Sequence, residues 1–344
     1  MNLPLNISAL SIPLPPASPQ FINLYDASSN SDAGQADRIA RELSDGLLQP
    51  AAALSPKFLY NELGSKLFEA ITRLDEYYPT RTEAAIFEAS SPQIAETLTA
   101  IGIRHACLID LGAGNCAKAT ALIPHLQPRQ YVPVDISVDF LRTAADQVQN
   151  LFPALDIVGL GMDFSGGLVL PDEVQKQERV FFYPGSSLGN FHPDEALTFL
   201  QHIADPAQGK ARGLLLGIDL VKDTATLEAA YDDALGVTAS FNKNMLLNVN
   251  ELIASDFDVR QWKHIGLFNT DKSRIEMHLE AMQDLTVSWP GHSRAFKAGE
   301  RIHTECSYKY TLGSMTALLQ QAGFRHIEHW TDPKSLFAVF WAAV

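Results

Sequence analysis

The sequence has few cysteines and no long apolar run. Its three cysteines, Cys107, Cys116 and Cys306, show no C-x-x-C spacing, so neither a disulfide framework nor a thiolate zinc site is indicated. No stretch of about eighteen apolar residues occurs, and the N-terminus lacks the positively charged region of a secretory signal. We therefore expect a cytoplasmic protein in a reducing compartment, with no membrane partner.

Positive charge is also scarce. The 26 Lys and Arg residues are outnumbered by 40 Asp and Glu residues, which gives a formal net charge of -14. A protein without a basic surface releases few counterions from phosphate, so we expect no nucleic-acid partner. The ten histidines never form H-x-x-x-H or H-E-x-x-H spacing, and we predict no metal site. A small molecule is the favoured ligand.

The sequence is organised around residues 107–115. A short apolar run there predicts a buried parallel strand that ends in Asp110, and Gly112 and Gly114 then let a ligand approach the backbone closely. About twenty residues beyond the turn, the strand predicted at 131–135 ends in Asp135, whose carboxylate can accept hydrogen bonds from both hydroxyls of a ribose. These acids and glycines are the first candidates for a nucleoside site.

A third apolar strand, 155–160, leads to Asp163 and Phe164. The carboxylate can accept a hydrogen bond from an adenine amine while the aromatic ring stacks on or flanks the base; a surface turn is the alternative interpretation. The glycine turn lacks the third glycine of the G-x-G-x-x-G fingerprint, and the hairpin predicted within 327–342 would give the sheet an antiparallel last strand. Both features favour S-adenosylmethionine, which has no phosphate, over a dinucleotide.

Strands and helices alternate up to residue 219, which predicts a mostly parallel sheet. The strand at 179–183 opens into the loop 184–191, whose Gly, Ser and Asn residues make it an active-site candidate. Residues 220–300 break this rhythm with two predicted helices, 227–239 and 241–253, followed by antiparallel strands. The predicted class is α/β: a Rossmann-like class I methyltransferase sheet with an antiparallel terminal strand, plus a second α+β substrate-binding domain.

The sequence of the N-terminal region predicts an arm followed by helices. Residues 1–35 are rich in Pro and Ser and predict a poorly anchored, mobile arm. A helix is predicted at 36–49, and another begins with Ser65 as its cap. We expect this region to lead directly into the first strand of the sheet through one further helix.

Two adjacent tyrosines precede that helix. Tyr78 stands before a proline, which predicts an extended backbone that could project Tyr77 and Tyr78 into a ligand site; half-buried packing is the alternative. The helix itself is predicted at 82–98, with a capping box that begins at Thr80 or Thr82.

Four longer segments carry a more specific signal. They are FLYNELGS (58–65), ITRLDEYYPTRTE (71–83), PGSSLGNF (184–191) and YDDALGVTASFNKN (231–244). They resemble the L-histidine Nα-methyltransferases of ergothioneine biosynthesis, and the similarity runs from about residue 36 to the C-terminus. The resemblance implies S-adenosylmethionine as cofactor, hercynine as product, a substrate-binding domain made of 36–80 and 220–306, and a cofactor domain made of 81–219 and 307–344.

The resemblance also implies how histidine is recognised. In the family a Glu and a Ser two residues apart hold the imidazole, and Glu305 and Ser307 match them. Residues i and i+2 of a strand share a face, so this pair can bracket two ring nitrogens while Cys306 faces away. Further implied positions are Tyr77, Asn190 and Tyr231 for the amino-acid carboxylate and amino group, Tyr60 near the amine, Met277 against the substrate ring, and Lys118 and Gly185 at cofactor and substrate positions.

The chemistry expected is an in-line displacement by a neutral amine, in which alignment supplies most of the rate. Tyr60, or a water that it orders, is the candidate that relays the amine proton, although a phenol with a pKa near 10 is a poor base at neutral pH. A two-ended clamp, with Asn190 and Tyr231 at one end and Glu305 and Ser307 at the other, would let the nitrogen rotate between three transfers.

The expected substrates are L-histidine and its mono- and dimethyl forms, acted on by a monomer. One alternative is an Nα-methyltransferase for tryptophan or another aromatic amino acid, which would not require an imidazole-binding Glu at position 305. The other alternative is a non-catalytic sensor that binds S-adenosylmethionine, against which the intact glycines, Asp135 and the loop around Asn190 weigh.

Overall fold

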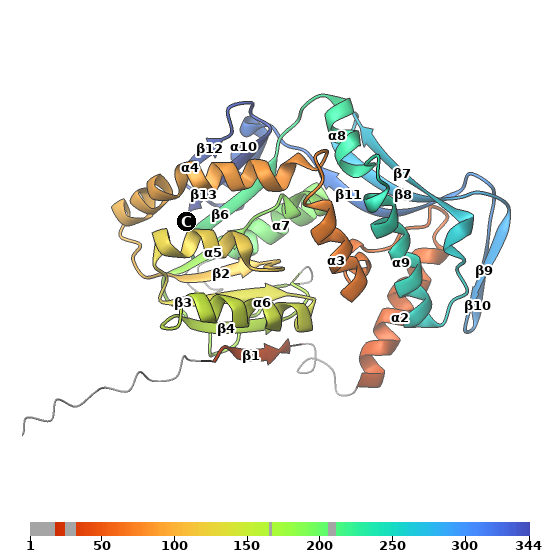
Figure 1. Ribbon diagram of the computed structural model, residues 1–344, viewed down its shortest axis with the longest axis horizontal. Helices are drawn as coiled ribbons and strands as arrows, with labels where there is room; N and C mark the ends of the chain where they lie inside the picture. The colour runs from red at the N-terminus through yellow and green to blue at the C-terminus, as the bar shows by residue number, and fades with distance from the viewer. Residues whose placement is uncertain (1–17, 25–31, 165–166, 206–210) are drawn as a thin grey trace, which may run out of the picture.

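An eight-stranded sheet forms the centre of the computed structural model, which describes residues 18–24, 32–164, 167–205 and 211–344 (Figure 1). The strand order is β1-β4-β3-β2-β5-β6-β13-β12. The strands are β1 (Gln20–Asn23), β2 (Cys107–Leu111), β3 (Gln130–Asp135), β4 (Asp156–Gly161), β5 (Arg179–Tyr183), β6 (Ala211–Asp219), β12 (His326–Thr331) and β13 (Phe337–Ala343). Neighbours from β1 to β6 are parallel, and β13 is antiparallel to β6 and β12. The predicted Rossmann-like sheet is confirmed.

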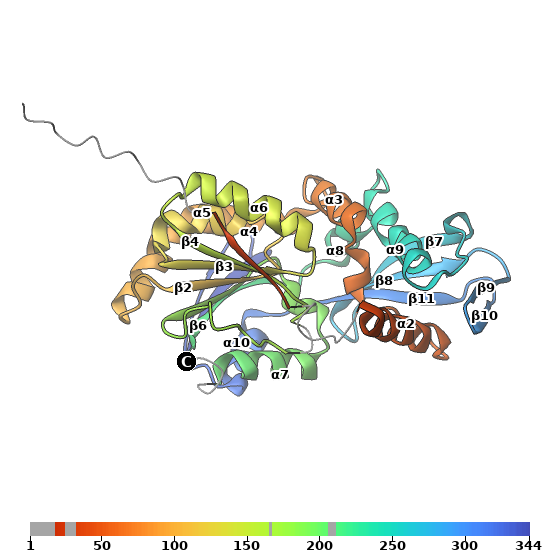
Figure 2. The same ribbon diagram turned by 90° about the horizontal axis from the view of Figure 1, so that it is seen from below.

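Helices cover both faces of this sheet because successive strand side chains point to opposite faces. Leu108 and Val180 belong to one hydrophobic cluster, while the adjacent Ile109 and Phe181 belong to another. The first cluster is closed by α4 (Tyr78–Ala100), α5 (Ala117–Leu126) and α6 (Val138–Leu151), and the second by α7 (Pro193–Ala204) and α10 (Leu312–Ala322). Figure 2 shows the two groups of helices on opposite sides of the sheet.

A second hydrophobic core combines two distant parts of the chain. Leu43 and Phe58 from the N-terminal part join Trp262, Leu279 and Ile302 from the late part. The elements of this region are α2 (Asp32–Leu48), η1 (Pro56–Leu59), α3 (Glu62–Ile71), α8 (Thr224–Tyr231), α9 (Val237–Ile253), η4 (Val259–Gln261), β7 (Trp262–Asn269), β8 (Arg274–Ala281), β9 (Leu285–Trp289), β10 (His292–Phe296) and β11 (Arg301–Tyr308). The two segments therefore pack into one discontinuous region, and its role in substrate binding stays a prediction.

The two regions meet where β6 and β11 end. Leu220 and Tyr310 form a parallel bridge, the Val221 N–H donates to the Tyr310 carbonyl at 3.0 Å, and the Tyr310 N–H donates to the Asp219 carbonyl at 3.3 Å. The end of β11 therefore lies beside the carboxyl edge of the sheet, where open α/β sheets bind ligands. Among the described residues, no helix combines the length and apolarity needed to cross a membrane.

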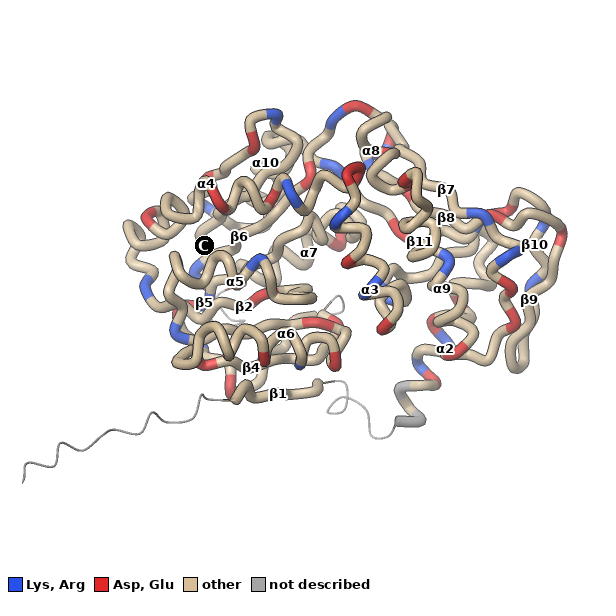
Figure 3. The backbone as a smooth tube through the Cα atoms, in the orientation of Figure 1, with Lys and Arg blue, Asp and Glu red and all other residues tan. Residues whose placement is uncertain are grey.

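Charged residues of both signs are interspersed along the chain in both regions (Figure 3). Some form exposed ion pairs: Lys66 Nζ lies 2.6 Å from Glu62 Oε1, and Lys297 Nζ lies 2.8 Å from Asp284 Oδ2. Exposed pairs of this kind contribute little to stability, because water screens both charges. At the junction of the two regions, Asp219 forms buried ion pairs with Lys222 and Lys309, and water screens these charges much less.

The starts of α3 and α4 differ from the sequence predictions. Asn61 caps α3, with its Oδ1 accepting from the Gly64 N–H at 2.8 Å, so the predicted cap Ser65 lies inside the helix. The next helix begins at Tyr78 rather than near Thr82, with the following proline in its first turn. Proline is tolerated there because the first N–H groups of a helix have no intrahelical acceptor. Tyr78 is therefore helical and buried, not extended.

A turn at 232–236 separates the next two helices, earlier than predicted. The Asp233 carboxylate accepts from the Val237 and Thr238 N–H groups at 3.0 and 2.7 Å, and Gly236 has a φ of 73°. Carboxylates and glycine are both favourable at helix starts of this kind. The predicted boundary near residue 240 was wrong because the apolar spacing continues smoothly across this capped turn.

Strand β1 falls within the arm predicted at residues 1–35, and there the prediction was wrong. Its backbone pairs in parallel register with β4, with Phe21 opposite Gly159. A Cβ on Gly159 would lie 2.4 Å from the Phe21 ring, so the glycine makes room for that ring. The guanidinium of Arg142 lies 4.7 Å from the centroid of the same ring. Residues 1–17 and 25–31 lie outside the described part of the chain.

Candidate active site

The glycine turn after β2 is held against the end of β3. Asp135 accepts from the Gly114 N–H at 2.9 Å and from the Ser137 N–H at 2.9 Å. Gly112 and Gly114 have φ values of 68° and 52°, and a Cβ on either would meet no atom within 4 Å. The turn thus combines backbone that favours glycine, open space and a half-buried carboxylate. These features fit a nucleoside that approaches the backbone closely.

Asp110 lies beneath this turn, in the sheet. It is 2% exposed, and its Oδ2 accepts from the Tyr131 hydroxyl at 2.7 Å, while Oδ1 has no hydrogen-bond partner. Burial raises the pKa of Asp110 to about 7, although the Tyr131 hydrogen bond opposes this shift. Its assignment to the cofactor remains a prediction; in the free protein its bonded partner is Tyr131.

Asp163 and Phe164 follow β4 on the same edge. Lys57 Nζ lies 3.3 Å from Asp163 Oδ2 and 2.8 Å from Glu42 Oε2, which joins the sheet to the N-terminal part of the second region. The Phe164 ring packs edge-on against Tyr183, with centroids 5.8 Å apart. Phe164 is therefore partly committed to the core, and contact with an adenine remains a prediction for both residues.

Lys118 and Gly185 both contact the carboxylate of Glu83, which was predicted to belong to a capping box. Glu83, fully buried on α4, pairs with Lys118 Nζ at 2.6 Å and accepts from the Gly185 N–H at 2.9 Å. A Cβ on Gly185 would lie 2.9 Å from Lys118 Nζ. Glu83 thus holds the start of loop 184–191 and the lysine side by side. Its apolar helical neighbours were the signal that it is buried.

Glu305 and Met277 are directly opposite each other on β11 and β8 and therefore share a face. Glu305 is 8% exposed, and its Oε2 is buried without a hydrogen-bond partner. Burial raises the pKa of Glu305 to about 7, opposed by the positive charge of Lys309. An unpaired buried carboxylate oxygen is costly, so this oxygen is suited to receive a hydrogen bond from a ligand.

Three buried tyrosines lie within the electrostatic influence of this carboxylate. Its charge contributes to the raised pKa values of Tyr60, Tyr77 and Tyr231, for each of which burial is the largest cause. The rings of Tyr77 and Tyr231 meet edge-on with centroids 6.1 Å apart. The structure therefore gathers four of the predicted site residues from four separate segments. It also shows that the Tyr60 phenol is harder to ionise than in water, which argues against a resting phenolate base.

A serine links Tyr60 to the nucleoside side. Ser137 Oγ donates to the Tyr60 carbonyl at 3.2 Å, while its backbone N–H donates to Asp135. The Tyr60 ring packs edge-on against Phe68 and Phe241, with centroids 5.7 and 5.4 Å away. The two expected halves of the site are therefore in direct contact through Ser137.

Loop 184–191 reaches the same place through η2 (Ser187–Asn190). A Cβ on Gly189 would lie 2.7 Å from the Tyr308 carbonyl, so this loop packs closely against β11. Cys306 Sγ lies 3.6 Å from the Asn190 carbonyl. Cys306 thus faces the loop, in agreement with the prediction that it faces away from Glu305 and Ser307. Asn190 is half-buried, and the role of its amide stays a prediction.

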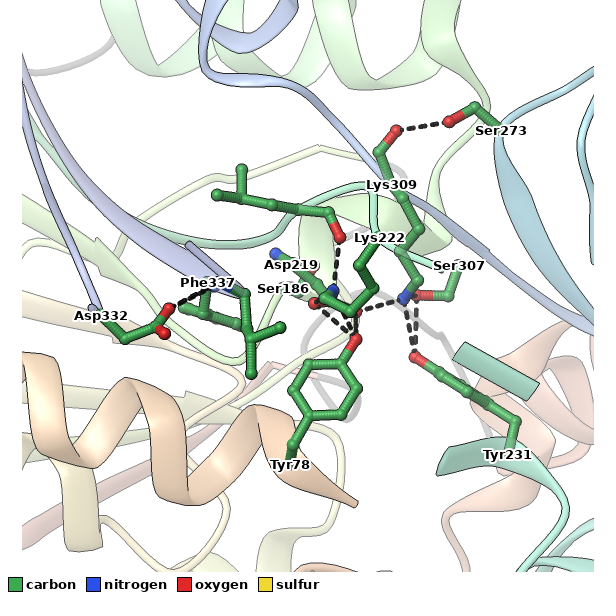
Figure 4. A network of polar contacts seen from close by, with 12 residues as sticks. Tyr78, Ser186, Asp219, Lys222, Tyr231, Ser273, Ser307, Lys309, Asp332 and Phe337 are labelled. Atoms are coloured by element: carbon green, nitrogen blue, oxygen red, sulfur yellow. Dashed lines mark hydrogen bonds and ion pairs between the residues drawn. The ribbon is translucent and has the colours of Figure 1, made fainter. Parts of the chain in front are cut away.

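Ser307 belongs to a network of buried polar groups shown in Figure 4. Lys309 Nζ donates to Ser307 Oγ at 2.8 Å and to the Tyr231 hydroxyl at 3.0 Å, and Tyr231 in turn donates to Ser307 at 3.0 Å. Lys309 Nζ also lies 2.8 Å from Asp219 Oδ2. Tyr231 and Ser307 are therefore bonded to each other, which differs from the predicted clamp with these residues at opposite ends.

Lys309 and Asp219 are site residues that were not predicted from the sequence. Each had a signal in the sequence. Lys309 continues the i, i+2 spacing of Glu305 and Ser307. Asp219 is an acid at the end of a strand, as are Asp135 and, one residue earlier in its strand, Asp110. The Tyr78 hydroxyl completes the group by donating to Asp219 at 2.8 Å.

The raised pKa of Glu305 leads to a pH prediction. Its folded-state pKa of about 7 exceeds the ordinary 4.5, so wild-type protein loses stability as pH rises from about 4.5 to 7 and the carboxyl ionises. Glu305→Gln mimics the protonated form. We expect this variant to be more stable than wild type at pH 8 by up to about 3 kcal/mol, and nearly equal at pH 4, below both pKa values. Thermal unfolding across this pH range measures the difference; a constant difference would contradict it.

The chain is similar to known proteins over most of its length. Residues 39–344 match the family described as histidine-specific methyltransferase, SAM-dependent. The chain is 38% identical to histidine N-alpha-methyltransferase of Mycolicibacterium smegmatis over 88% of its length and 94% of that protein. It is 37% identical to the protein of the same name from Mycobacterium tuberculosis, over 91% and 96%. The resemblance of its motifs is thereby confirmed, and the chain belongs to the family of histidine-specific, S-adenosylmethionine-dependent methyltransferases.

Proposed function

We propose that this protein transfers three methyl groups in succession from S-adenosylmethionine to the α-amino nitrogen of L-histidine, forming hercynine for ergothioneine biosynthesis. The observation that carries this proposal is the buried, unpartnered Oε2 of Glu305 on the same strand as Ser307. An imidazole has two nitrogens on one ring, and these two side chains offer it an acceptor and a hydroxyl. The family and its two mycobacterial members support the same substrate.

On the cofactor side, Asp135 is the residue proposed to accept hydrogen bonds from the ribose hydroxyls of S-adenosylmethionine. Gly112 and Gly114 leave open space beside the backbone for it, and Asp110, Lys118, Asp163 and Phe164 are further proposed contacts. When bound, the cofactor supplies a methyl group on a positively charged sulfur. The neutral thioether that remains after transfer is a good leaving group. The protein therefore needs no strong acid for this step.

On the acceptor side, the residues must hold the imidazole while the amine turns between transfers. Glu305 and Ser307 are proposed to hold the ring, Met277 to lie against it, and Tyr77, Asn190 and Gly185 to contact the amino-acid end. Tyr231 is bonded to Ser307, so we place it between the two ends. Alignment of the amine with the methyl carbon and sulfur then accounts for most of the rate.

The amine must be neutral to attack. Because the pKa of Tyr60 is raised by burial, we propose that its phenol stays protonated and positions the amine or a water, which carries the proton away. The enzyme would bind free histidine and its mono- and dimethyl forms in turn. Its three cysteines are unpaired and buried, which is compatible with the reducing cytoplasm we propose as its location.

A single incubation series tests this function. The protein is mixed with S-adenosylmethionine and each of the twenty amino acids, and products are analysed by mass spectrometry. We expect gains of one, two and three methyl groups on histidine alone. Methylation of tryptophan instead would support the first alternative, whereas cofactor and histidine binding without any product would support a sensor.

Asp135→Asn tests the cofactor side separately. The substitution removes the negative charge of a carboxylate that accepts from two backbone N–H groups and is proposed to accept from the ribose. We therefore expect S-adenosylmethionine to bind about 10-fold to 100-fold more weakly. Isothermal titration calorimetry measures the affinity. Asp139→Asn is the matched control, because this exposed acid lies four residues further on; equal losses in the two variants would contradict the assignment.

A further inference from the structure

The chain passes between the two regions at three places, and all three converge on one group of buried side chains. Tyr78 stands at the first passage, Asp219 and Lys222 at the second, and Lys309 at the third. Figure 4 shows the side chains of these residues directed toward one another. Through Lys309, this group of residues contacts Ser307 and Tyr231 of the proposed histidine site.

Every donor of Lys309 is engaged. An ammonium has three N–H bonds, and Lys309 directs them to Ser307 Oγ at 2.8 Å, Tyr231 Oη at 3.0 Å and Asp219 Oδ2 at 2.8 Å. Its side chain is 0% exposed, so no water competes for these positions. The ammonium is therefore held in place, and Asp219 is its paired carboxylate.

This arrangement determines what the Ser307 hydroxyl can do. A hydroxyl has one hydrogen and two lone pairs, and Ser307 Oγ already accepts from Lys309 and from Tyr231. Because both lone pairs are occupied, the Ser307 hydroxyl can interact with a ligand only by donating its hydrogen. Glu305, when ionised, can only accept. The two residues therefore present one donor and one acceptor to any ring bound between them.

We propose that Lys309, held by Asp219, is a positioning and specificity-determining residue that forces Ser307 to donate, so that the site selects a ring with both an N–H and a free lone pair. Neutral imidazole has this pattern: one nitrogen carries the hydrogen for Glu305, and the other accepts from Ser307. The inference rests on the proposed function and names the feature of histidine that the site reads. Rings with an N–H and no acceptor nitrogen, such as pyrrole, are discriminated against.

Lys222 provides a matched control. Its Nζ lies 2.6 Å from Asp219 Oδ1 and donates to the Tyr78 hydroxyl and to the Leu220 carbonyl, and it is 6% exposed. It therefore shares the carboxylate and the burial of Lys309. Its described bonds do not include Ser307 or Tyr231. Lys222 also remains beside Asp219 when Lys309 is replaced, so Lys309→Met does not leave that carboxylate unpaired.

The experiment compares L-histidine with the two pyrrolylalanines in which one or the other ring nitrogen is a C–H. Steady-state methylation gives KM and kcat for each, and the readout is the KM of the better pyrrole analogue divided by the KM of histidine. We expect a ratio of about 10 or more in wild type. Lys309→Met and Ser307→Ala should each lower the ratio about 10-fold, mostly through the KM of histidine.

The double variant and the control decide whether Lys309 acts through Ser307. If it does, Lys309→Met should change the ratio little in the Ser307→Ala background, and Lys222→Met should keep the wild-type ratio even if its melting temperature falls. A wild-type ratio in Lys309→Met, or an equal drop in Lys222→Met, would overturn the inference.

Two further results keep the test decisive. Should Lys309→Met fail to fold, Tyr231→Phe releases one lone pair of Ser307 and is expected to lower the same ratio, and an unchanged ratio in that variant would overturn the inference. If wild-type protein fails to methylate histidine at all, the proposed function itself falls. That outcome differs from active wild type with an unchanged ratio in the variants.

Discussion

Glu305→Ala is expected to reduce kcat/KM for L-histidine by about 100-fold to 1,000-fold, mainly through KM. In wild type the buried Glu305 Oε2 has no protein partner and is free to accept from the imidazole N–H. In the alanine variant that N–H would be buried without an acceptor. Sites built to bond a polar ligand group discriminate strongly on that group. Steady-state kinetics with saturating S-adenosylmethionine measure the effect.

Two companion variants make this result interpretable. Glu305→Gln keeps an acceptor oxygen and the shape of the side chain, so its loss should be smaller than that of the alanine variant. Glu280→Ala removes a carboxylate from the neighbouring strand β8, where it pairs with Arg301 at 2.8 Å, and should leave kcat/KM close to wild type. An unchanged KM for histidine in Glu305→Ala would rule out the assignment of this residue to the imidazole.

The second large effect concerns stability. Asp219→Ala is expected to lower the free energy of unfolding by about 3–5 kcal/mol, the usual cost of leaving a buried charge unpaired. Here the substitution leaves two buried cations without their carboxylate. Lys309 and Lys222 are 0% and 6% exposed, and both pair with Asp219. Chemical denaturation followed by circular dichroism measures the change.

An exposed ion pair supplies the comparison. Asp284 pairs with Lys297 at 2.8 Å, and both side chains are more than half exposed, so Asp284→Ala should cost far less stability than Asp219→Ala. Similar losses for the two alanine variants would mean that the buried network contributes no more than a surface pair. Addition of histidine and cofactor should not restore Asp219→Ala fully, since the unpaired cations remain.

The sheet was predictable because its strands carry local signals. The predicted strand 179–183 has the bounds of β5, and the predicted strand 131–135 differs from β3 by one residue. Apolar runs that end in acids mark strand ends without reference to the rest of the chain. The antiparallel last strand was also visible, as two apolar runs flank a Thr-Asp-Pro turn.

The network at the junction was not predictable in the same way. Tyr78, Asp219 and Lys309 each look ordinary in their own segments, and the hydrogen bond from Tyr78 to Asp219 spans 141 positions of sequence. A local pattern shows where a strand ends but not which other strand ends lie beside it. The resemblance supplied Glu305 and Ser307, whereas the donor role of Ser307 required the positions of its partners.

The edge position of β1 has a consequence for solubility. Without this strand, β4 would become the outer strand of the sheet and would present unpaired N–H and C=O groups beside Val158 and Leu160. Open edges of this kind pair readily with strands of other molecules. The family match begins only at residue 39, so a protein trimmed to the matched region would keep the residues of the active site and still expose a surface that favours aggregation.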